Sequence, residues 1–155
     1  MEATTHAVLE MLFEGAPGLV MRCEARPGES VATLLERAEQ IARSMPEEEQ
    51  IALLNAHPRI GADPSTVSAL SHSEQGYDRD PSTDELQSRL DRLNDEYERR
   101  FGFRFCVFVA GRSRTEIAEV MESHLDADRD EELDRALTDV FAIARNRADK
   151  LTGPI

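Results

Sequence analysis

A histidine and a glutamate, each at the edge of a predicted helix, have the side-chain chemistry needed to move protons. His57 directly precedes Pro58, and a second polar group follows with Ser71, Glu74 and Gln75. The unperturbed pKa of an imidazole lies near neutrality, so histidine exchanges protons readily at cellular pH. An imidazole and a carboxylate suffice for proton transfer without a cofactor. We therefore predict an acid–base site built on His57 and Glu74.

Both residues also have purely structural explanations. A proline pushes the residue before it out of the α region, so a helix must end close to His57, where an imidazole often caps the last carbonyl groups. Ser71 and Glu74 match the Ser-x-x-Glu capping box of a helix N-terminus. These roles are compatible with catalysis, because a helix N-terminus also holds a carboxylate in its ionised form.

Arg147 lies along the margin of the apolar stripe of the last predicted helix. A guanidinium in that position either reaches water along its aliphatic stem or faces an anion, and the first outcome is the commoner one. Arg145 and Lys150 instead have the pattern of solvated surface charges. Arg147 is therefore the candidate for binding an anionic group.

Other kinds of catalytic site have no matching pattern. The four histidines are scattered, without a His-Glu-x-x-His motif, so we predict no metal. The glycines do not cluster as in a phosphate-binding loop, and no Gly-x-Ser-x-Gly elbow occurs. Cys23 and Cys106 form no metal-ligand pattern and suggest no disulfide framework, so we expect both to be reduced.

The composition is typical of an ordinary soluble globular protein, and two cysteines expected to be reduced predict a cytoplasmic location. The 155 residues are 40% hydrophobic and 32% charged. The formal net charge of −13 argues against binding to nucleic acid or to an anionic membrane surface, although a pocket can still hold a small anion. The N-terminus lacks the pattern of a secretory signal, and no apolar stretch approaches the roughly 18 residues of a membrane span.

Apolar residues recur at helical spacing through most of the chain. Serines before apolar runs, and prolines or glycines next to them, mark the expected helix boundaries. The predicted helices cover residues 5–14, a short stretch from Pro17 toward Arg26, Val31 to Ala42, Pro46 to near His57, a long stretch from Ser82 to Gly102, 114–125, and Leu133 to Leu151.

The run from Phe103 to Gly111 differs from the rest because it is almost continuously hydrophobic and has the composition of a buried strand. One strand cannot form a sheet by itself. The simplest architecture is therefore all-α: a single-domain bundle of roughly seven to nine helices over residues 1–155, with one extended buried connection near 103–110.

Four short motifs, taken in order, resemble one family over nearly the whole chain. They are AHPRIG, SHSEQ, FGFRFCVFVAGR and ALTDVFAIARNRADKL. The 2-oxo-4-hydroxy-4-carboxy-5-ureidoimidazoline (OHCU) decarboxylases of urate breakdown are similar in having Ala-His-Pro-x-hydrophobic-Gly, Ser-x-x-Glu-Gln, Tyr-x-x-x-Phe-Gly-Phe-Pro-Phe and a C-terminal helix with a late arginine. The matching positions are Arg26-Pro27, His57-Pro58, Ser71, Glu74, Gln75, Tyr97, Phe101-Gly102-Phe103 and Arg147.

The resemblance implies an all-helical homodimer without a metal or organic cofactor. It also implies that the chain converts OHCU to S-allantoin, with uricase and hydroxyisourate hydrolase as its neighbours in the pathway. His57 would be the catalytic acid/base, and Glu74 its partner at the substrate. The substrate-binding residues would be Pro58, Ser71, Gln75, Phe105, Val107, Phe108, Val109 and Arg147.

The chain departs from the family pattern at three places. Arg104 stands where proline is usual, Arg59 stands where aspartate is common, and GYDRDPS replaces the small residues that often follow Glu-Gln. The segment between His57 and Glu74 is also short. These departures bear on the shape of the pocket more than on the reaction.

Two other functions are compatible with the same residues. A non-enzymatic helical domain could dock a basic partner on its acidic surface. His57, Glu74 and Arg147 would then be a cap, a capping-box residue and a charge that reaches solvent, and they need not lie near one another. A related lyase or hydrolase could instead use the His57–Glu74 pair on another ureido or imidazoline compound.

Overall fold

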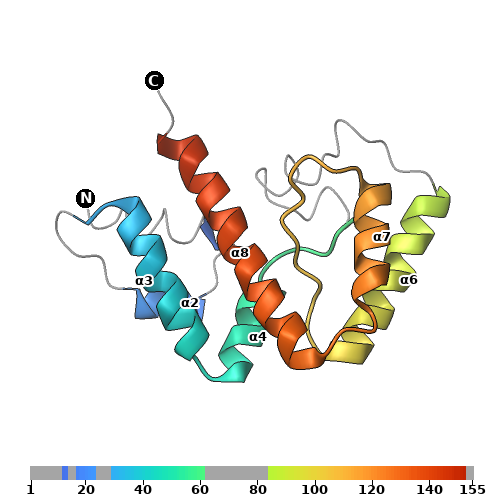
Figure 1. The fold of residues 1–155 in the computed structure, drawn as a ribbon, viewed down its shortest axis with the longest axis horizontal. Helices are drawn as coiled ribbons and strands as arrows, with labels where there is room; N and C mark the ends of the chain where they lie inside the picture. Colours follow the sequence, from blue (N-terminus) through green and yellow to red (C-terminus); the bar gives the residue numbers. More distant parts are fainter. Residues whose placement is uncertain (1–11, 14–16, 24–28, 62–83, 153–155) are drawn as a thin grey trace. The chain divides into compact units, whose positions relative to one another are not determined.

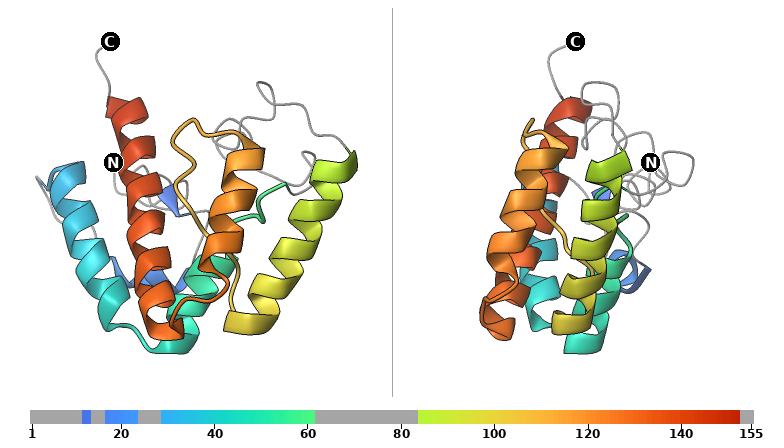
Figure 2. Two further views of the ribbon diagram at one scale, coloured as in Figure 1. Left: turned by 45° about the vertical axis from the view of Figure 1, so that its right-hand side comes forward. Right: turned by 90° about the vertical axis from the view of Figure 1, so that its right-hand side faces the viewer.

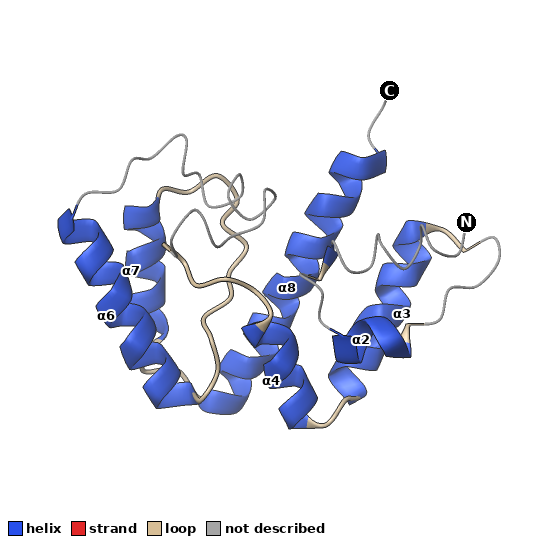
Figure 3. Cartoon of the chain, turned by 180° about the vertical axis from the view of Figure 1, so that it is seen from behind, coloured by secondary structure: helices blue, strands red, loops and turns tan. Residues whose placement is uncertain are grey.

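The computed structural model describes residues 12–13, 17–23, 29–61 and 84–152 of the chain. Within these ranges every regular element is a helix and no strand occurs (Figures 1 and 3), so the predicted all-α class is confirmed. The helices are α2 (Pro17–Arg22), α3 (Val31–Ser44), α4 (Glu47–Asn55), α6 (Asp84–Phe101), α7 (Arg114–His124) and α8 (Arg129–Thr152).

The helices that the structure describes are fewer than the number predicted for the whole chain. The described ranges contain six, which does not support the predicted count of roughly seven to nine. Of the predicted helix over 5–14 only residues 12 and 13 are described, and the capping box of Ser71 and Glu74 lies outside the described residues. Among the described helices, none combines the length and the apolar character that a membrane span requires.

Contacts between residues divide the chain into two compact units. The first unit comprises residues 1–57 and 137–155, and the second comprises residues 58–136. Helix α8 therefore contributes residues 129–136 to the second unit and residues 137–152 to the first. That residues 1–155 form a single domain stays a prediction.

In the first unit, α3 begins at the N-cap that the sequence predicts. The Ser30 hydroxyl accepts a hydrogen bond from the Thr33 N–H at 3.1 Å, which satisfies one of the N–H groups left open at a helix start.

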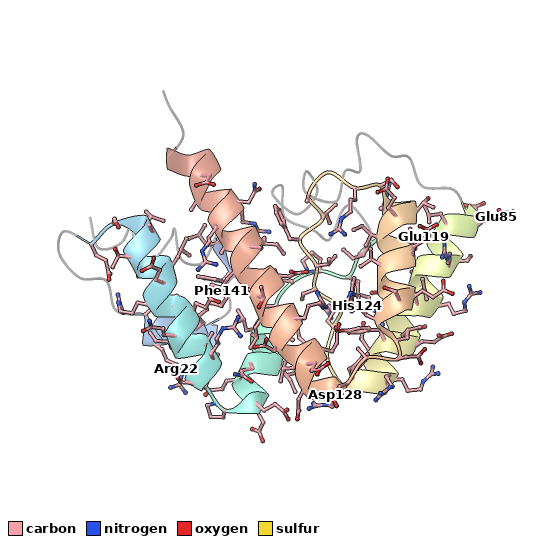
Figure 4. The ribbon with its side chains drawn as sticks, viewed as in Figure 1. Arg22, Glu85, Glu119, His124, Asp128 and Phe141 are labelled. Atoms are coloured by element: carbon pink, nitrogen blue, oxygen red, sulfur yellow. The ribbon has the colours of Figure 1, made fainter. Side chains whose placement is uncertain are left out.

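The helices of the first unit pack through buried apolar side chains. Helix α2 packs against α3 and α4. Phe13 meets Phe141 of α8 edge to face, with ring centroids 5.3 Å apart (Phe141 is labelled in Figure 4). The residues that α3 buries are Leu34, Leu35, Ala38 and Ala42.

Helix α4 begins one residue later than predicted. Pro46 is its N-cap, with an extended ψ of 148°, and three glutamates fill the first turn. Carboxylates there face the positive end of the helix dipole, which stabilises this helix start. The helix ends at Asn55 and Ala56 is its C-cap, two residues before Pro58. The end therefore lies where the proline was expected to force it.

In the second unit, α6 and α7 are neighbours that run in the same direction (Figure 2). Parallel neighbours need a connection that returns along their length, and a non-helical chain covers that distance with fewer residues than a helix would. Residues 102–113 form this connection. Gly102, with a φ of 81°, turns the chain out of α6, and its N–H donates to the carbonyl of Glu98 at 2.8 Å.

The hydrophobic run in this connection is buried, as predicted, but forms no strand. The hydrophobic composition of this run, which is also typical of a strand, therefore reflects its burial and not the presence of a sheet. The run ends in a tight turn, in which Ala110 and Gly111 have φ values of 52° and 77° and the Arg112 N–H donates to the carbonyl of Val109 at 3.1 Å. The buried residues of the run are Phe103, Phe105, Cys106, Val107 and Val109.

Candidate active site

His57 lies just beyond the end of α4 and is almost completely buried, with 4% of its surface exposed. Its Nδ1 lies 3.0 Å from the carbonyl oxygen of Leu53, one turn earlier. A carbonyl oxygen only accepts hydrogen bonds, so Nδ1 carries the hydrogen and Nε2 is the basic nitrogen of the neutral ring. The predicted cap is thus present, and it also selects the tautomer and orients the ring.

Arg147 is buried in the first unit, with 1% of its surface exposed. Its guanidinium therefore does not reach out to water, which was the commoner of the two expected outcomes. Arg145 is a surface charge, as predicted, and pairs with Glu39 at 2.6 Å. A buried guanidinium attracts an anion more strongly than an exposed one, because less water competes. Burial therefore fits an anion-binding role for Arg147.

Arg59, which stands where the family commonly has aspartate, binds two acids of α6 in the second unit. Its Nε donates to Glu98 at 2.7 Å and its Nη2 donates to Asp95 at 2.9 Å. An aspartate at this position would face the same two carboxylates and be repelled by them. The departure from the family pattern is therefore matched by the acids of α6.

The backbone after Arg59 is held by amide side chains of the same helix. Asn94 donates to the carbonyl of Ile60 at 3.0 Å, and Gln87 donates to the carbonyl of Gly61 at 2.9 Å. Gly61 has a φ of 79°, and a Cβ there would lie 2.8 Å from a methyl carbon of α6, so this turn requires glycine. Helix α6 thereby fixes the path of the AHPRIG segment after its proline.

The connection between α6 and α7 presents backbone carbonyl groups to two arginines. Arg135 Nη1 donates to the carbonyl of Cys106 at 2.9 Å. Arg112 donates from Nη2 to the carbonyl of Phe108 at 2.7 Å and from Nε to that of Val109 at 3.0 Å. These hydrogen bonds satisfy carbonyl groups that would bind the backbone N–H groups of a neighbouring strand in a sheet. They fix the backbone of the predicted substrate-binding segment.

A buried acid of α8 organises a polar cluster in the second unit that sequence reasoning missed. Glu132 is 1% exposed and accepts two hydrogen bonds from Arg135, at 2.9 and 2.6 Å, and one from the Tyr97 hydroxyl. His124, labelled in Figure 4, lies 3.2 Å from the same carboxylate. Burial and then the bond to Glu132 raise the pKa of Tyr97 far above its ordinary value, so the phenol stays a donor.

The available sequence signal for this cluster was weak. Glu132 and Arg135 have i,i+3 spacing on α8, which is equally typical of a solvated surface pair. Tyr97 shares the apolar face of its predicted helix with leucines and belongs to the family motif, and neither feature indicates a partner on α8.

The structure describes the predicted site residues in two groups. His57 and Arg147 belong to the first unit. Pro58 and the four predicted residues of the connection belong to the second, where Pro58 and Phe108 are half-buried and Phe105, Val107 and Val109 are buried. The polar residues Ser71, Glu74 and Gln75 lie outside the described residues. The pairing of His57 with Glu74 therefore stays a prediction.

Comparison with known proteins gives relatives that share most of this chain. The chain is 31% identical over 147 residues to the 2-oxo-4-hydroxy-4-carboxy-5-ureidoimidazoline decarboxylase of Halalkalicoccus jeotgali, across 92% of this chain and 82% of that protein. It is 28% identical over 146 residues to the uric acid degradation bifunctional protein PucL of Bacillus subtilis. That alignment covers 93% of this chain but spans only 30% of PucL.

A solved structure shares the fold of this chain, and a family model shows its family. The crystal structure of OHCU decarboxylase in the presence of (S)-allantoin has the same fold, with a TM-score of 0.77 and 20% identity over 94% of this chain and 96% of that one. The model of the family described as OHCU decarboxylase matches residues 1–149. This chain therefore belongs to the OHCU decarboxylase family.

Proposed function

We propose that this chain catalyses the cofactor-free decarboxylation of OHCU to S-allantoin in urate degradation, as a carbon–carbon lyase. Family membership over residues 1–149 supports this reaction and favours an enzyme over a non-enzymatic docking domain. The observation that carries the proposal is the buried imidazole of His57, whose Nδ1–H donates a hydrogen bond to the Leu53 carbonyl and whose Nε2 is therefore the base.

The chemistry of OHCU explains why few protein groups are needed. One ring carbon carries both a carboxylate and a hydroxyl, next to a carbon–nitrogen double bond. When the carbon–carboxylate bond breaks and CO2 leaves, its electron pair passes to the neighbouring C=N. The substrate thus supplies its own electron sink, which in other decarboxylases a cofactor provides. The protein must orient the carboxylate, accept the hydroxyl proton and deliver a proton to one face of the new planar carbon.

His57 and Glu74 divide the work of proton transfer and orientation. His57 exchanges a proton through Nε2 with the hydroxyl or with the developing carbanion. Glu74 accepts hydrogen bonds from ring or ureido N–H groups, helped by the Gln75 amide, and Ser71 and Pro58 line the substrate. The held orientation of the His57 ring supports this assignment, because general acid–base catalysis requires a fixed direction of proton transfer.

Arg147 and the backbone of residues 105–109 bind the oxygen atoms of the substrate. Arg147 is a fixed positive charge, and its burial strengthens its attraction for a carboxylate. Backbone N–H groups in the connection add uncharged donors for carbonyl or carboxylate oxygens. Phe105, Val107, Phe108 and Val109 supply the apolar walls of this part of the site.

The product of fresh OHCU tests the reaction. OHCU made from urate with uricase and hydroxyisourate hydrolase decays unaided to racemic allantoin, so we expect the enzyme to speed the decay and give one enantiomer, measured by circular dichroism. A chain that leaves the rate unchanged and yields racemic allantoin overturns the proposed function. Allantoate-type ureides, assayed in parallel, report the related lyase or hydrolase.

His57→Asn tests the role of the imidazole. Loss of a general acid–base group lowers the rate by roughly 10²–10⁴-fold, and we expect that loss in kcat while the protein still folds. Arg145→Gln, a surface change in the same unit, serves as the control and should keep the full rate. Full turnover by the His57→Asn protein would remove the assignment.

The resemblance also supports a homodimer in the cytoplasm, with uricase and hydroxyisourate hydrolase as pathway neighbours and no metal. Sedimentation equilibrium of the purified chain measures the oligomeric state. A monomer at working concentrations contradicts the dimer.

A further inference from the structure

The carbonyl groups along the connection between α6 and α7 are turned toward arginine side chains. Arg135 binds the carbonyl of Cys106 at 2.9 Å, and Arg112 binds the carbonyl of Phe108 at 2.7 Å. Both bonds come from charged donors, which form the stronger class of hydrogen bond. The orientation of these two peptide groups is therefore set by side chains.

The two fixed carbonyls also fix two N–H groups. In a planar trans peptide the N–H of the next residue points opposite to the carbonyl, and no cis peptide occurs in the described residues. The N–H groups of Val107 and Val109 therefore point away from the arginines that bind Cys106 and Phe108. Among the described residues, neither N–H donates to a backbone carbonyl. Two donors, two residues apart, thus remain on the other side of the segment.

Arg135 is itself held rigidly. Its Nε and Nη2 both bind Glu132, at 2.9 and 2.6 Å, and its guanidinium carbon lies 5.1 Å from the centre of the Phe105 ring. Glu132 is buried and also accepts a hydrogen bond from the Tyr97 hydroxyl. Because the guanidinium is planar and two of its nitrogens are bound to Glu132, the direction of its third nitrogen is fixed. This nitrogen, Nη1, donates to the carbonyl of Cys106.

We propose that Arg112 and Arg135 are positioning residues for the decarboxylation: by holding the carbonyls of Cys106 and Phe108, they aim the N–H groups of Val107 and Val109 at an oxygen of the substrate. This inference rests on the proposed function, in which residues 105–109 bind OHCU. Neither arginine touches the substrate. Both act through the peptide groups that they hold, as a preorganised donor pair requires.

Three variants separate positioning from general stability. Arg112→Gln removes the bond to Phe108 from a half-buried arginine at the end of the connection, and Arg135→Lys keeps the charge beside Glu132 but loses the fork. The control is Arg89→Gln, which removes a 2.9 Å ion pair between α6 and α7 in the same unit.

We expect both positioning variants to lower kcat/KM by roughly 10-fold to 100-fold, because displacement of reacting groups by about 1 Å has effects of that size. The melting temperature of Arg112→Gln should lie near that of the Arg89→Gln control, which keeps the wild-type kcat/KM. Positioning variants that match the control in both quantities overturn the inference. If Arg135→Lys does not fold, the comparison of Arg112→Gln with the control decides.

A second measurement reads the N–H groups directly. With the protein labelled at valine nitrogen, addition of S-allantoin should shift the amide resonances of Val107 and Val109, and Arg112→Gln should reduce those shifts. Unchanged resonances in an active wild-type protein overturn this inference but leave the proposed function standing. A wild-type protein without activity on OHCU overturns the proposed function, and the inference with it.

Discussion

Two glutamates, one in each unit, bind arginines in similar ways but in different surroundings. Glu39 of α3, in the first unit, accepts hydrogen bonds from Arg43 at 3.0 Å and from Arg145 at 2.6 Å, and 22% of its side chain is exposed. Glu132 of α8, in the second unit, accepts two bonds from Arg135 and is 1% exposed. Distances alone would rank the two acids as equals.

The two glutamates contribute differently to stability because water reaches one of them and not the other. At Glu39, water competes with the arginines, and an exposed ion pair of this kind contributes about 0–1 kcal/mol. At Glu132, water is not available as an alternative partner, so removal of the carboxylate leaves the Tyr97 hydroxyl buried without its acceptor. The same bond length therefore corresponds to different free energies in the two units.

Glu132→Gln should have the largest effect. The amide keeps the shape of the side chain but removes the negative charge that faces Arg135, the Tyr97 hydroxyl and His124. Removal of one partner of a buried ion pair lowers the free energy of unfolding by about 3–5 kcal/mol, and the partial exposure of Arg135 places the expected loss near the lower value. Urea unfolding at neutral pH measures it.

The matched change in the other unit is Glu39→Gln, which should cost about 1 kcal/mol or less. If the two substitutions lower the free energy of unfolding equally, the distinction between a buried and an exposed acid fails for this protein.

The helix boundaries that the sequence predicts follow from local rules. Ser30 and Ser113 each accept the expected N-cap hydrogen bond, at 3.1 Å in both cases. Gly102 adopts the positive φ that ends α6. Each of these signals needs only a few neighbouring residues, so the chain displays them without its tertiary contacts.

Burial of polar groups depends on distant parts of the chain and was predicted poorly. The place of Arg147 at the margin of an apolar stripe distinguishes it from Arg145 but does not decide whether its guanidinium reaches water. The spacing of Glu132 and Arg135 on the same helix is equally typical of an exposed pair. The hydrophobic run from Phe103 to Gly111 also depends on distant parts of the chain. Its composition predicts burial but does not show whether a neighbouring strand is present. The position of Arg147 at the margin of the apolar stripe and the family resemblance both single out this residue, whereas Glu132 had no such signal.

Tyr97→Phe should have an intermediate effect. A phenyl ring fits among the surrounding rings of Phe101, Phe103 and Phe105, so only the hydrogen bond to Glu132 is lost. A hydrogen bond to a charged group contributes about 1.5–3 kcal/mol, and the remaining bonds from Arg135 place the expected loss near the lower value.

A double-mutant cycle with Glu132→Gln checks the origin of the Tyr97→Phe effect. We expect a coupling free energy of at least about 1 kcal/mol between the two positions. Additive losses would show that the hydroxyl stabilises the fold through some other contact.

Glu39 should give the smallest effect, visible mainly in its pH dependence. Burial alone would raise the pKa of Glu39, but hydrogen bonds from Arg145 and Arg43 outweigh it and hold the pKa below its ordinary value of 4.5. The folded state therefore binds the proton less tightly than the unfolded state does. The stabilisation is fully present above the unfolded pKa and is lost as the pH falls through the folded pKa.

The test compares the wild type with Glu39→Gln between about pH 3 and pH 7. The wild type should be more stable by up to about 1 kcal/mol at the neutral end, and the difference should vanish at the acidic end. Salt at about 1 M should shrink the neutral difference, because it screens exposed charges. A difference that grows as the pH falls would mean that the Glu39 carboxyl is stabilised in its protonated form, and the arginines would then not set its pKa.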